Sequence, residues 1–458
     1  MGNYDRATFR PRTWHDATPA FHDGGDTPRA YLERCLETIA AREPVVRAFV
    51  VLNEAGARGA ADASTARWRA GRPLSPIDGM PLGIKDLLET RDMPTQMNCA
   101  AMAGNFPKRD NAAVRALREA GAVILGKTVT AELGGAHPGP TTNPFDPART
   151  PGGSSSGSAA AVGAGMLPAA LGTQVGGSII RPAAYCANVA LKPSQGAIHR
   201  GERQTTSQST HGMHAGCIED VWLTMIEIAR RVGGDPGRAA LTGPTAPPAA
   251  RRPERLIVME TEGWASLDAP SRATFEALLD RLAAQGIAIL RRDAHPLIAR
   301  FEAGIAEARA ISAVITGWEN RWYQRAMLDI HPGGISARGI AALERAEALS
   351  LADYETALAL RAEAQARHAR IAPLADAVIA LACPGPAPLW PGDAPGAPLA
   401  PRPTGDVAFN TPSSMLFAPA VTVPLLAVSG MPVGVQIMTP PGEDARAMAI
   451  AGWLDGMR

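Results

Sequence analysis

Lysine is scarce in this chain. Lysine and arginine together number 45, and only Lys85, Lys108, Lys127 and Lys192 are lysines. Arginine keeps its proton at ordinary pH, whereas a buried lysine can lose it. A lysine retained in such a composition is therefore either an accidental surface residue or a group that must deprotonate. Lys85 is the most notable, because it ends the apolar run "GMPLGIK" (79–85).

Several other features are also missing. The net charge is +1 with no block of one sign, which gives no electrostatic support for nucleic acid or an anionic membrane as a partner. The five cysteines include no C-x-x-C pair, so we expect neither a disulfide framework nor a zinc site. We therefore expect the protein to be in a reducing compartment, the cytoplasm. The N-terminal stretch has no apolar core of a signal peptide, and no apolar run is a convincing membrane span.

What is present predicts a large α/β protein. The 458 residues are 46% hydrophobic, enough for a sizeable core. Strand and helix signals alternate, and Thr27-Pro28 has the pattern of a helix start. We predict helices at 28–42, at 54–70 and, capped by Asp110, up to about 120; strands at 45–52, 80–84 and 122–125; a mostly helical region at 300–372; and surface loops at 235–253 and 384–404.

One motif is misleading. "GAVILGKT" (121–128) matches the phosphate-binding pattern G-x-x-x-x-G-K-[ST]. A real phosphate loop is flexible between its glycines, whereas Ala122–Leu125 is itself a predicted strand. Extended residues cannot curl their amides around a phosphate, so we do not expect nucleotide binding.

Serine and glycine are concentrated in two stretches. "RTPGGSSSGSAAAVGAG" (149–165) is either a flexible linker or a tight turn that leads into a helix. In "LGTQVGGSIIRPAAYCANVALKP" (171–193), two glycines precede Ser178. Consecutive glycines can point backbone N–H groups at one spot, and a hydroxyl beside such donors suits acyl transfer.

No histidine completes this arrangement. None of the nine histidines lies in a triad signature, and "HGMH" (211–214) lacks the carboxylate spacing of a metal site, so we expect no metal there. Lysine is therefore the candidate base, as in the serine–lysine variants of serine catalysis.

These motifs together resemble the amidase signature family, and the similarity covers roughly residues 29–455. The resemblance implies a single amidase domain with a central mixed, mostly parallel β-sheet covered by helices on both faces. It divides the chain into a core (29–235, 254–300 and 373–455) and a helical insertion or lid (301–372). The segments that carry it are "GMPLGIKD", "TTNPFDPARTPGGSSSGSAAAVGAG", "LGTQVGGSIIRPAAYCANVALKP", "AYLERCLETIAAREPVVRAFV", "NAAVRALREAGAVILGKTVTAEL" and "FNTPSSMLFAPAVTVPLLAVSGMPVGVQIM".

The resemblance also implies a Ser–cis-Ser–Lys triad. By motif alignment Lys85 is the base, Ser154 the bridging serine after a cis bond from Gly153, and Ser178 the nucleophile. The implied oxyanion donors are backbone amides of Val175, Gly176, Gly177 and Ser178. No cofactor or metal is implied.

Two positions depart from the commoner family pattern "GTDTGGSIRxPA". The aspartate is replaced by Gln174, and the arginine stands one place later, at Arg181. We expect both to be supporting residues, with direct contact to the substrate as the alternative, and an amide–arginine hydrogen bond could replace the ion pair. Residues 205–220 also depart from the "SLDxxGPxA"-like segment of amidotransferase subunits.

Three functions follow as hypotheses. The first is a stand-alone amidase for neutral aryl or bulky amides, with activity on esters and carbamates (urethanes). The second is an amidotransferase A-type subunit that releases ammonia from glutamine, and the third is an inactive scaffold. The substrate is a small molecule in the first two; homodimers are common in the family, and the oligomeric state stays open. Candidate pocket segments are 95–102, 134–139 and the aromatic cluster of Trp318, Trp322, Tyr323 and Met327, for which simple core packing is the alternative.

Overall fold

A single twisted sheet organises the structure, a computed structural model that describes residues 3–135, 137–201, 206–393 and 398–457. Its eleven strands follow the order β1-β3-β2-β4-β6-β5-β10-β11-β9-β7-β8. The strands are β1 (Phe49–Leu52), β2 (Pro81–Lys85), β3 (Val123–Thr128), β4 (Ala169–Gln174), β5 (Val189–Lys192), β6 (Thr210–Ala215), β7 (Arg255–Val258), β8 (Ala288–Leu290), β9 (Ala377–Leu381), β10 (Ala420–Val428) and β11 (Met431–Met438).

The sheet is mixed, as predicted, but the expectation that it would be mostly parallel is wrong. Parallel pairs form two groups, β3-β2-β4 and β8-β7-β9. The other neighbours, β1-β3, β4-β6, β6-β5, β5-β10, β10-β11 and β11-β9, are antiparallel. Part of the reason is the tight turn at Ser429-Gly430, where both residues have positive φ and β10 reverses directly into β11; such a turn joins antiparallel strands only.

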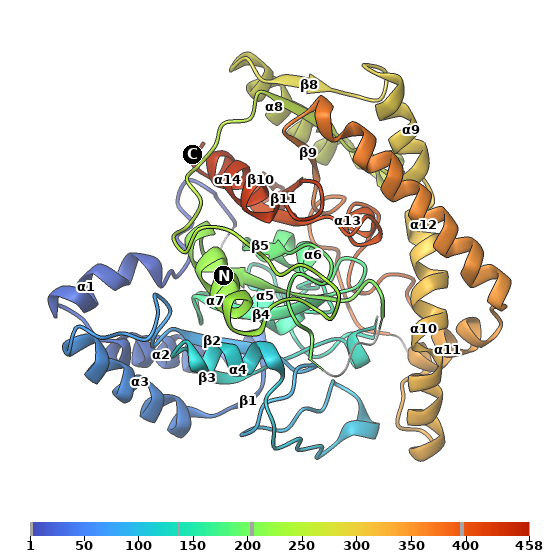
Figure 1. Cartoon of the computed structure of the whole chain (residues 1–458). Coiled ribbons are helices and arrows are strands. Elements are labelled where there is room, and N and C mark those ends of the chain that lie inside the picture. The colour runs from blue at the N-terminus through green and yellow to red at the C-terminus, as the bar shows by residue number, and fades with distance from the viewer. Residues whose placement is uncertain (1–2, 136, 202–205, 394–397, 458) are drawn as a thin grey trace.

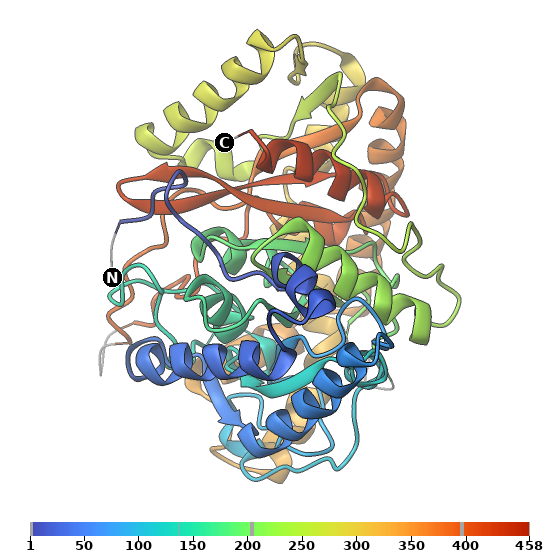
Figure 2. The same ribbon diagram turned by 90° about the vertical axis from the view of Figure 1, so that its left-hand side faces the viewer.

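Helices cover both faces of the sheet. Every residue of β2, β3, β4, β5, β6, β9 and β11 is buried, and successive side chains of a strand point to opposite faces. The helices are α1 (Thr18–Asp23), α2 (Pro28–Val46), α3 (Glu54–Arg69), α4 (Ala112–Glu119), α5 (Ser156–Gly163), α6 (Ile180–Tyr185), α7 (Ile218–Val232), α8 (Ala269–Ala284), α9 (Pro296–Ile305), α10 (Ala308–Ile330), α11 (Ala337–Glu347), α12 (Leu351–Ile371), α13 (Thr411–Met415) and α14 (Asp444–Asp455). Short 3₁₀ segments lie at His15–Ala17, Ala100–Met102, Glu132–Gly134, Glu262–Ser266 and Ala372–Leu374. Figure 2 shows the β10–β11 ribbon across the upper part of the molecule, with α2 and α3 below it. Among these helices, none combines the length and apolarity needed to cross a membrane.

The first long helix illustrates how local sequence sets an element boundary. Thr27 Oγ1 accepts from the Ala30 N–H, and Pro28 is the first helical residue, as predicted. The helix continues to Val46, beyond the predicted end, and the strand begins only at Phe49. The reason lies in the Glu43 carboxylate, which accepts the N–H groups of Ala48 and Phe49, while Arg47 ends the helix with φ of 50°.

A second cap was predicted one residue too early. Asn111, not Asp110, caps α4, with its side-chain oxygen accepting from the Ala113 N–H at 3.0 Å. Asp110 instead accepts from the Arg91 N–H and pairs with Arg118. The phosphate-loop pattern lies on strand β3, which agrees with the interpretation from sequence.

The region predicted to be helical contains α10, α11 and α12, with α9 beginning just before it. Figure 1 shows these four helices gathered along one side of the molecule, beside the sheet. The description of 301–372 as an insertion or lid on the core 29–235, 254–300 and 373–455 stays a prediction.

Candidate active site

Lys85 ends β2, in the middle of the parallel group β3-β2-β4, and its side chain is fully buried. Its Nζ lies within hydrogen-bonding distance of Ser154 Oγ at 2.7 Å, of Thr173 Oγ1 at 2.8 Å and of the Thr173 carbonyl oxygen at 3.2 Å. Burial, assisted by the positive charge of Arg181, lowers the pKa of Lys85 well below its usual value. This setting favours the neutral amine, which is the form that can accept a proton.

Ser154 lies just before α5, at the end of the glycine-rich turn. The Gly153–Ser154 peptide bond is cis, as the resemblance implied. Gly152 has φ of 84°, and a Cβ there would lie 2.8 Å from Pro182 Cα, so both backbone conformation and close packing require glycine. The stretch 149–165 is thus a tight turn followed by a helix, and not a flexible linker.

The segment Val175–Ser178 follows β4 and lines a cavity. In the described part of the chain, the N–H groups of Gly176, Gly177 and Ser178 donate to no protein acceptor. The Ser178 carbonyl oxygen accepts from the Ser155 N–H at 3.3 Å, which ties this segment to the turn that carries Ser154. The fold therefore brings Lys85, Ser154 and the 175–178 segment to one place.

The expected hydrogen bond between Gln174 and Arg181 is absent among the described contacts, and that prediction is wrong. Gln174 Oε1 accepts the N–H groups of Ile179 and Ile180 at 2.8 and 3.0 Å, and its Nε2 donates to Ser414 Oγ. The amide oxygen of Gln174 thus holds the turn that follows Ser178.

Arg181 makes a different set of contacts. Its Nη2 donates to the Gly153 carbonyl oxygen at 2.7 Å, and its Nε donates to the Thr404 carbonyl oxygen at 2.7 Å. Nη2 also reaches Thr404 Oγ1 at 3.1 Å. Arg181 is 3% exposed, and burial lowers its pKa to about 10. It therefore carries a buried positive charge that joins the Ser154 turn to residue 404.

The cavity has a volume of about 960 Å³ and is lined by the two candidate catalytic serines and by segments that are distant in sequence. Ser154, Thr173 and Ser178 form part of its wall. The remaining wall includes residues 87–89, 109–112, 133–135, 199–201 and 401–405, single residues at 209 and 211, and parts of the helices α10 and α11. A cavity of this size is typical of a small-molecule site.

The predicted pocket segments contribute only in part. From 95–102 Met97 lines the cavity, and from 134–139 Gly134 and Gly135 do, while Ala136 lies outside the described residues. Of the four aromatic-cluster residues, Tyr323 lines the cavity. The other three are placed elsewhere: Trp318 stacks on Tyr354, Trp322 is 71% exposed, and Met327 packs in a small apolar cluster.

Sequence reasoning missed most of the polar wall. Lining residues without a predicted role include Arg109, Arg115, His199, Arg200, His211, Arg309, Arg345, Arg402 and Thr404. Arginine is so common in this chain that no local signal distinguishes these arginines from surface ones. The end of the predicted surface loop 384–404 forms part of the wall through residues 401–404.

His211 and His214 lie on β6 and are buried. Burial is the main cause that lowers the pKa of each to about 3, so both imidazoles are neutral. Among the described residues, no cluster of three or more histidine, cysteine or acidic side chains could hold a metal ion.

The family model Amidase matches residues 30–448. The chain belongs to the amidase signature family. Members of this family are enzymes that act on carbon–nitrogen amide bonds of small-molecule amides.

The match to this chain covers nearly the whole length of some relatives and less than half of others. A crystal structure of an amidase is 29% identical, with a TM-score of 0.83, and the match covers 97% of this chain and 99% of that one. The peptide amidase of Stenotrophomonas maltophilia is 25% identical, with a TM-score of 0.74, and the match covers 97% and 96% of the two chains. A curated relative, the A-type subunit of the glutamyl-tRNA(Gln) amidotransferase of Chloroflexus aggregans, is 42% identical over 212 residues, but the match spans 44% of this chain and 43% of that protein.

Proposed function

We propose that this family member is a stand-alone amidase that hydrolyses carboxamide C–N bonds through an acyl-enzyme on Ser178. The observation that carries the proposal is the fully buried Lys85, whose Nζ lies 2.7 Å from Ser154 Oγ. Its lowered pKa suits a base that works through Ser154.

In the proposed reaction, Ser178 Oγ attacks the carbonyl carbon while its proton passes through Ser154 to Lys85. Backbone N–H groups of Val175–Ser178 stabilise the oxyanion that forms. The C–N bond then breaks, and the relay returns the proton to the leaving nitrogen. Water attacks the resulting ester with the same groups as base and acid, and Ser178 is regenerated. Gly153, Gln174 and Arg181 act as supporting residues, and the mechanism uses no cofactor or metal.

For the substrate we propose neutral aryl or bulky amides, and in addition esters and carbamates. The cavity volume of about 960 Å³ supports a substrate of this size. The five cysteines are all free, which supports a reducing compartment, and we propose the cytoplasm. A homodimer is a further proposal, which sedimentation of the purified protein would test.

One alternative is favoured by a specific observation. Curated relatives that are 40–45% identical carry the name of the A-type subunit of glutamyl-tRNA(Gln) amidotransferase, and this supports glutamine as substrate and a partner complex. The match spans less than half of each of these proteins. Under this alternative, the purified protein would prefer glutamine over simple amides.

The first experiment compares hydrolysis of 4-nitroacetanilide, a longer acyl anilide, an aryl carbamate, a nitrophenyl ester and glutamine. We expect Lys85→Ala to lower kcat/KM on the anilides by about 10²–10⁴-fold, the usual contribution of general acid–base catalysis. Lys192→Ala is the matched control, because Lys192 is equally buried but its Nζ contacts the Pro193 carbonyl oxygen instead of a serine of the candidate site.

Full activity in a folded Lys85→Ala variant would contradict the proposed base. Labelling by a fluorophosphonate, and its loss in Ser178→Ala, separates an active enzyme from an inactive scaffold. Preference of the wild-type protein for glutamine over every anilide would favour the amidotransferase alternative.

A further inference from the structure

We infer that the apolar end of the cavity beside Ser154 holds the amine half of the substrate, so that the enzyme prefers amides of apolar amines over primary amides. This inference rests on the proposed function. It assigns Leu133, Met97 and Tyr323 as specificity-determining residues.

The segment after β3 borders Ser154. The Ala131 N–H donates to the Ser154 carbonyl oxygen at 3.0 Å. A Cβ added at Gly134 would lie 4.0 Å from Ser154 Oγ and 2.9 Å from Leu87 Cδ1. Space next to the Ser154 hydroxyl is therefore bounded by Gly134 and its neighbours.

That space is apolar. Leu87, Met97, Leu133 and Tyr323 all line the cavity, and all four belong to or pack against one cluster of buried apolar residues. The cluster joins three segments that are distant in sequence: the loop after β2, the 3₁₀ turn Glu132–Gly134 and helix α10. Together they make a compact apolar wall for a substrate group.

The backbone of this wall is held in an unusual conformation. Met97 and Leu133 have φ of 56° and 50°, in the left-handed region that bulky residues rarely adopt. The Leu133 N–H donates to the Met97 carbonyl oxygen at 2.9 Å, and the Met97 N–H donates to Asp86 Oδ2 at 2.9 Å. Such conformations in bulky residues cluster at ligand sites, where the surroundings determine them.

The proposed chemistry decides which half of the substrate faces this wall. When the C–N bond breaks, the leaving nitrogen takes its proton from Ser154 Oγ, so it must lie within hydrogen-bonding distance of that atom. A substituent on that nitrogen then extends into the space beside Gly134, Leu133 and Met97. Ammonia would leave this apolar space empty, whereas an aryl or alkyl amine fills it.

The test uses two substrate series. One keeps the butyryl group and changes the amine, from butyramide to 4-nitrobutyranilide; the other keeps 4-nitroaniline and changes the acyl group from acetyl to butyryl. Leu133→Asn is the main variant, because asparagine tolerates positive φ and is close to leucine in size. Leu349→Asn is the matched control, a half-buried leucine that lines the same cavity outside the apolar cluster.

We expect Leu133→Asn to lower the anilide-to-primary-amide ratio of kcat/KM by about tenfold or more, as for a changed contact in an apolar subsite. The acetyl-to-butyryl ratio should stay unchanged, and Leu349→Asn should leave the anilide-to-amide ratio unchanged. Tyr323→Ala gives an independent measurement on α10: it should shift preference from the anilide toward the larger 2-naphthylamide.

Equal losses on anilide and primary amide in Leu133→Asn, with a changed acyl ratio, would overturn the inference and leave the proposed function intact. Unchanged preference in Tyr323→Ala would also overturn it. Absence of any amide hydrolysis by the wild-type protein would overturn the proposed function itself, and this inference with it.

Discussion

At the scale of single residues, the four lysines separate by what surrounds their ammonium groups. Lys108 is exposed, whereas Lys85, Lys127 and Lys192 are fully buried. Lys127 Nζ pairs with Asp86 at 2.9 Å, and Lys192 lies near the charge of Asp444, with a pKa lowered to about 7 by burial. The charged group that acts on the pKa of Lys85 is a cation, Arg181. Lys85 is therefore the lysine of this set whose neutral form is most favoured by its surroundings.

This setting predicts a specific pH dependence. Neutral Lys85 is the active form in the proposed mechanism, so kcat/KM rises with pH through the Lys85 pKa. Arg181 lowers that pKa, and Arg181→Gln removes the charge, so the acidic limb of the profile should move to higher pH. Arg181→Lys loses the forked contacts to Gly153 and Thr404, and a lysine at this buried position can give up its proton, so the limb should again move to higher pH while kcat falls by up to about 10²-fold.

The pH profile of kcat/KM on 4-nitroacetanilide, measured from acidic to alkaline pH, checks this prediction. An acidic limb in Arg181→Gln at the wild-type position would show that Arg181 acts through geometry alone.

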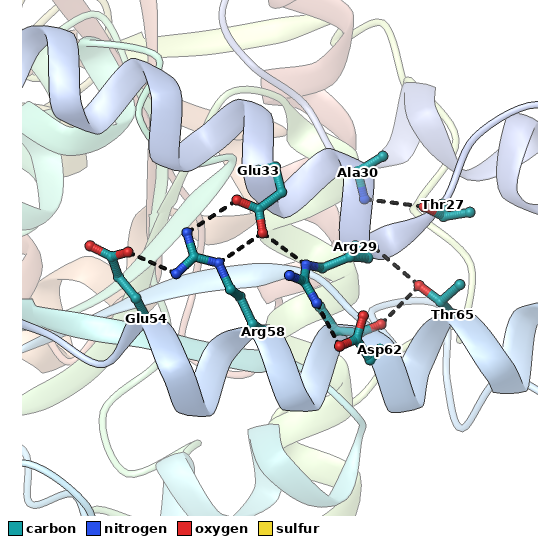
Figure 3. A network of polar contacts seen from close by, with 9 residues as sticks. Thr27, Arg29, Ala30, Glu33, Glu54, Arg58, Asp62 and Thr65 are labelled. Atoms are coloured by element: carbon teal, nitrogen blue, oxygen red, sulfur yellow. Dashed lines mark hydrogen bonds and ion pairs between the residues drawn. The ribbon is translucent and has the colours of Figure 1, made fainter.

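At the scale of elements, α2 and α3 show that surface ion pairs and helix caps contribute differently to stability. Figure 3 shows Arg29, Glu33 and Arg58 bridging the two helices, with Arg29 Nε and Arg58 Nε 2.8 and 2.9 Å from the Glu33 carboxylate. These side chains are about one-third exposed, and ion pairs in such positions contribute little to stability. The Thr27 cap satisfies a backbone N–H that no residue inside the helix can pair.

Removal of this cap should be measurable. We expect Thr27→Ala to lower the free energy of unfolding by about 1 kcal/mol, and Thr27→Ser to lower it much less, because serine keeps the hydroxyl acceptor. Urea unfolding followed by circular dichroism measures both variants. Equal stability of the alanine and serine variants would mean that the hydroxyl does not act as a cap.

At the scale of the whole molecule, polar contacts link the helical region at 301–372 to the segments that carry the candidate active site. The Glu132 carboxylate accepts from the Ser336 N–H at 2.8 Å and from the Ser336 hydroxyl. The Gly334 carbonyl oxygen accepts from the Ala101 N–H at 3.0 Å. Glu132 directly precedes Leu133 of the cavity wall, so the docking of the helical region and the shape of the cavity depend on the same residues.

Loss of the Glu132–Ser336 contact should weaken substrate binding more than it slows the chemical step. We expect Glu132→Ala to raise KM for the anilides by about tenfold with a smaller change in kcat, because a hydrogen bond to a charged group contributes about 1.5–3 kcal/mol. Ser336→Ala should have a smaller effect, since the Ser336 N–H remains. The double variant should be no worse than Glu132→Ala alone; additive losses would show that the two residues act independently.

Local features of this protein were determined by the sequence itself. The Thr27 cap, the strand that ends at Lys85, the turn before α5 and the strand character of 123–128 depend on the hydrogen bonds and φ preferences of adjacent residues. The family followed from the same local motifs. Boundaries that depend on distant side chains were less predictable, as the late end of α2 and the cap at Asn111 show.

Only the tertiary structure decided what surrounds the candidate site. The Lys85–Ser154 contact joins residues 69 apart, and the Arg181–Thr404 contact joins residues 223 apart. The same holds for the antiparallel pairing of most neighbouring strands and for the arginines that line the cavity from distant segments. It also holds for Gln174 and Arg181, which contact different partners instead of each other. Each depends on which buried groups packing brings within hydrogen-bonding distance, and a buried polar group takes the partner that the fold supplies rather than its neighbour in sequence.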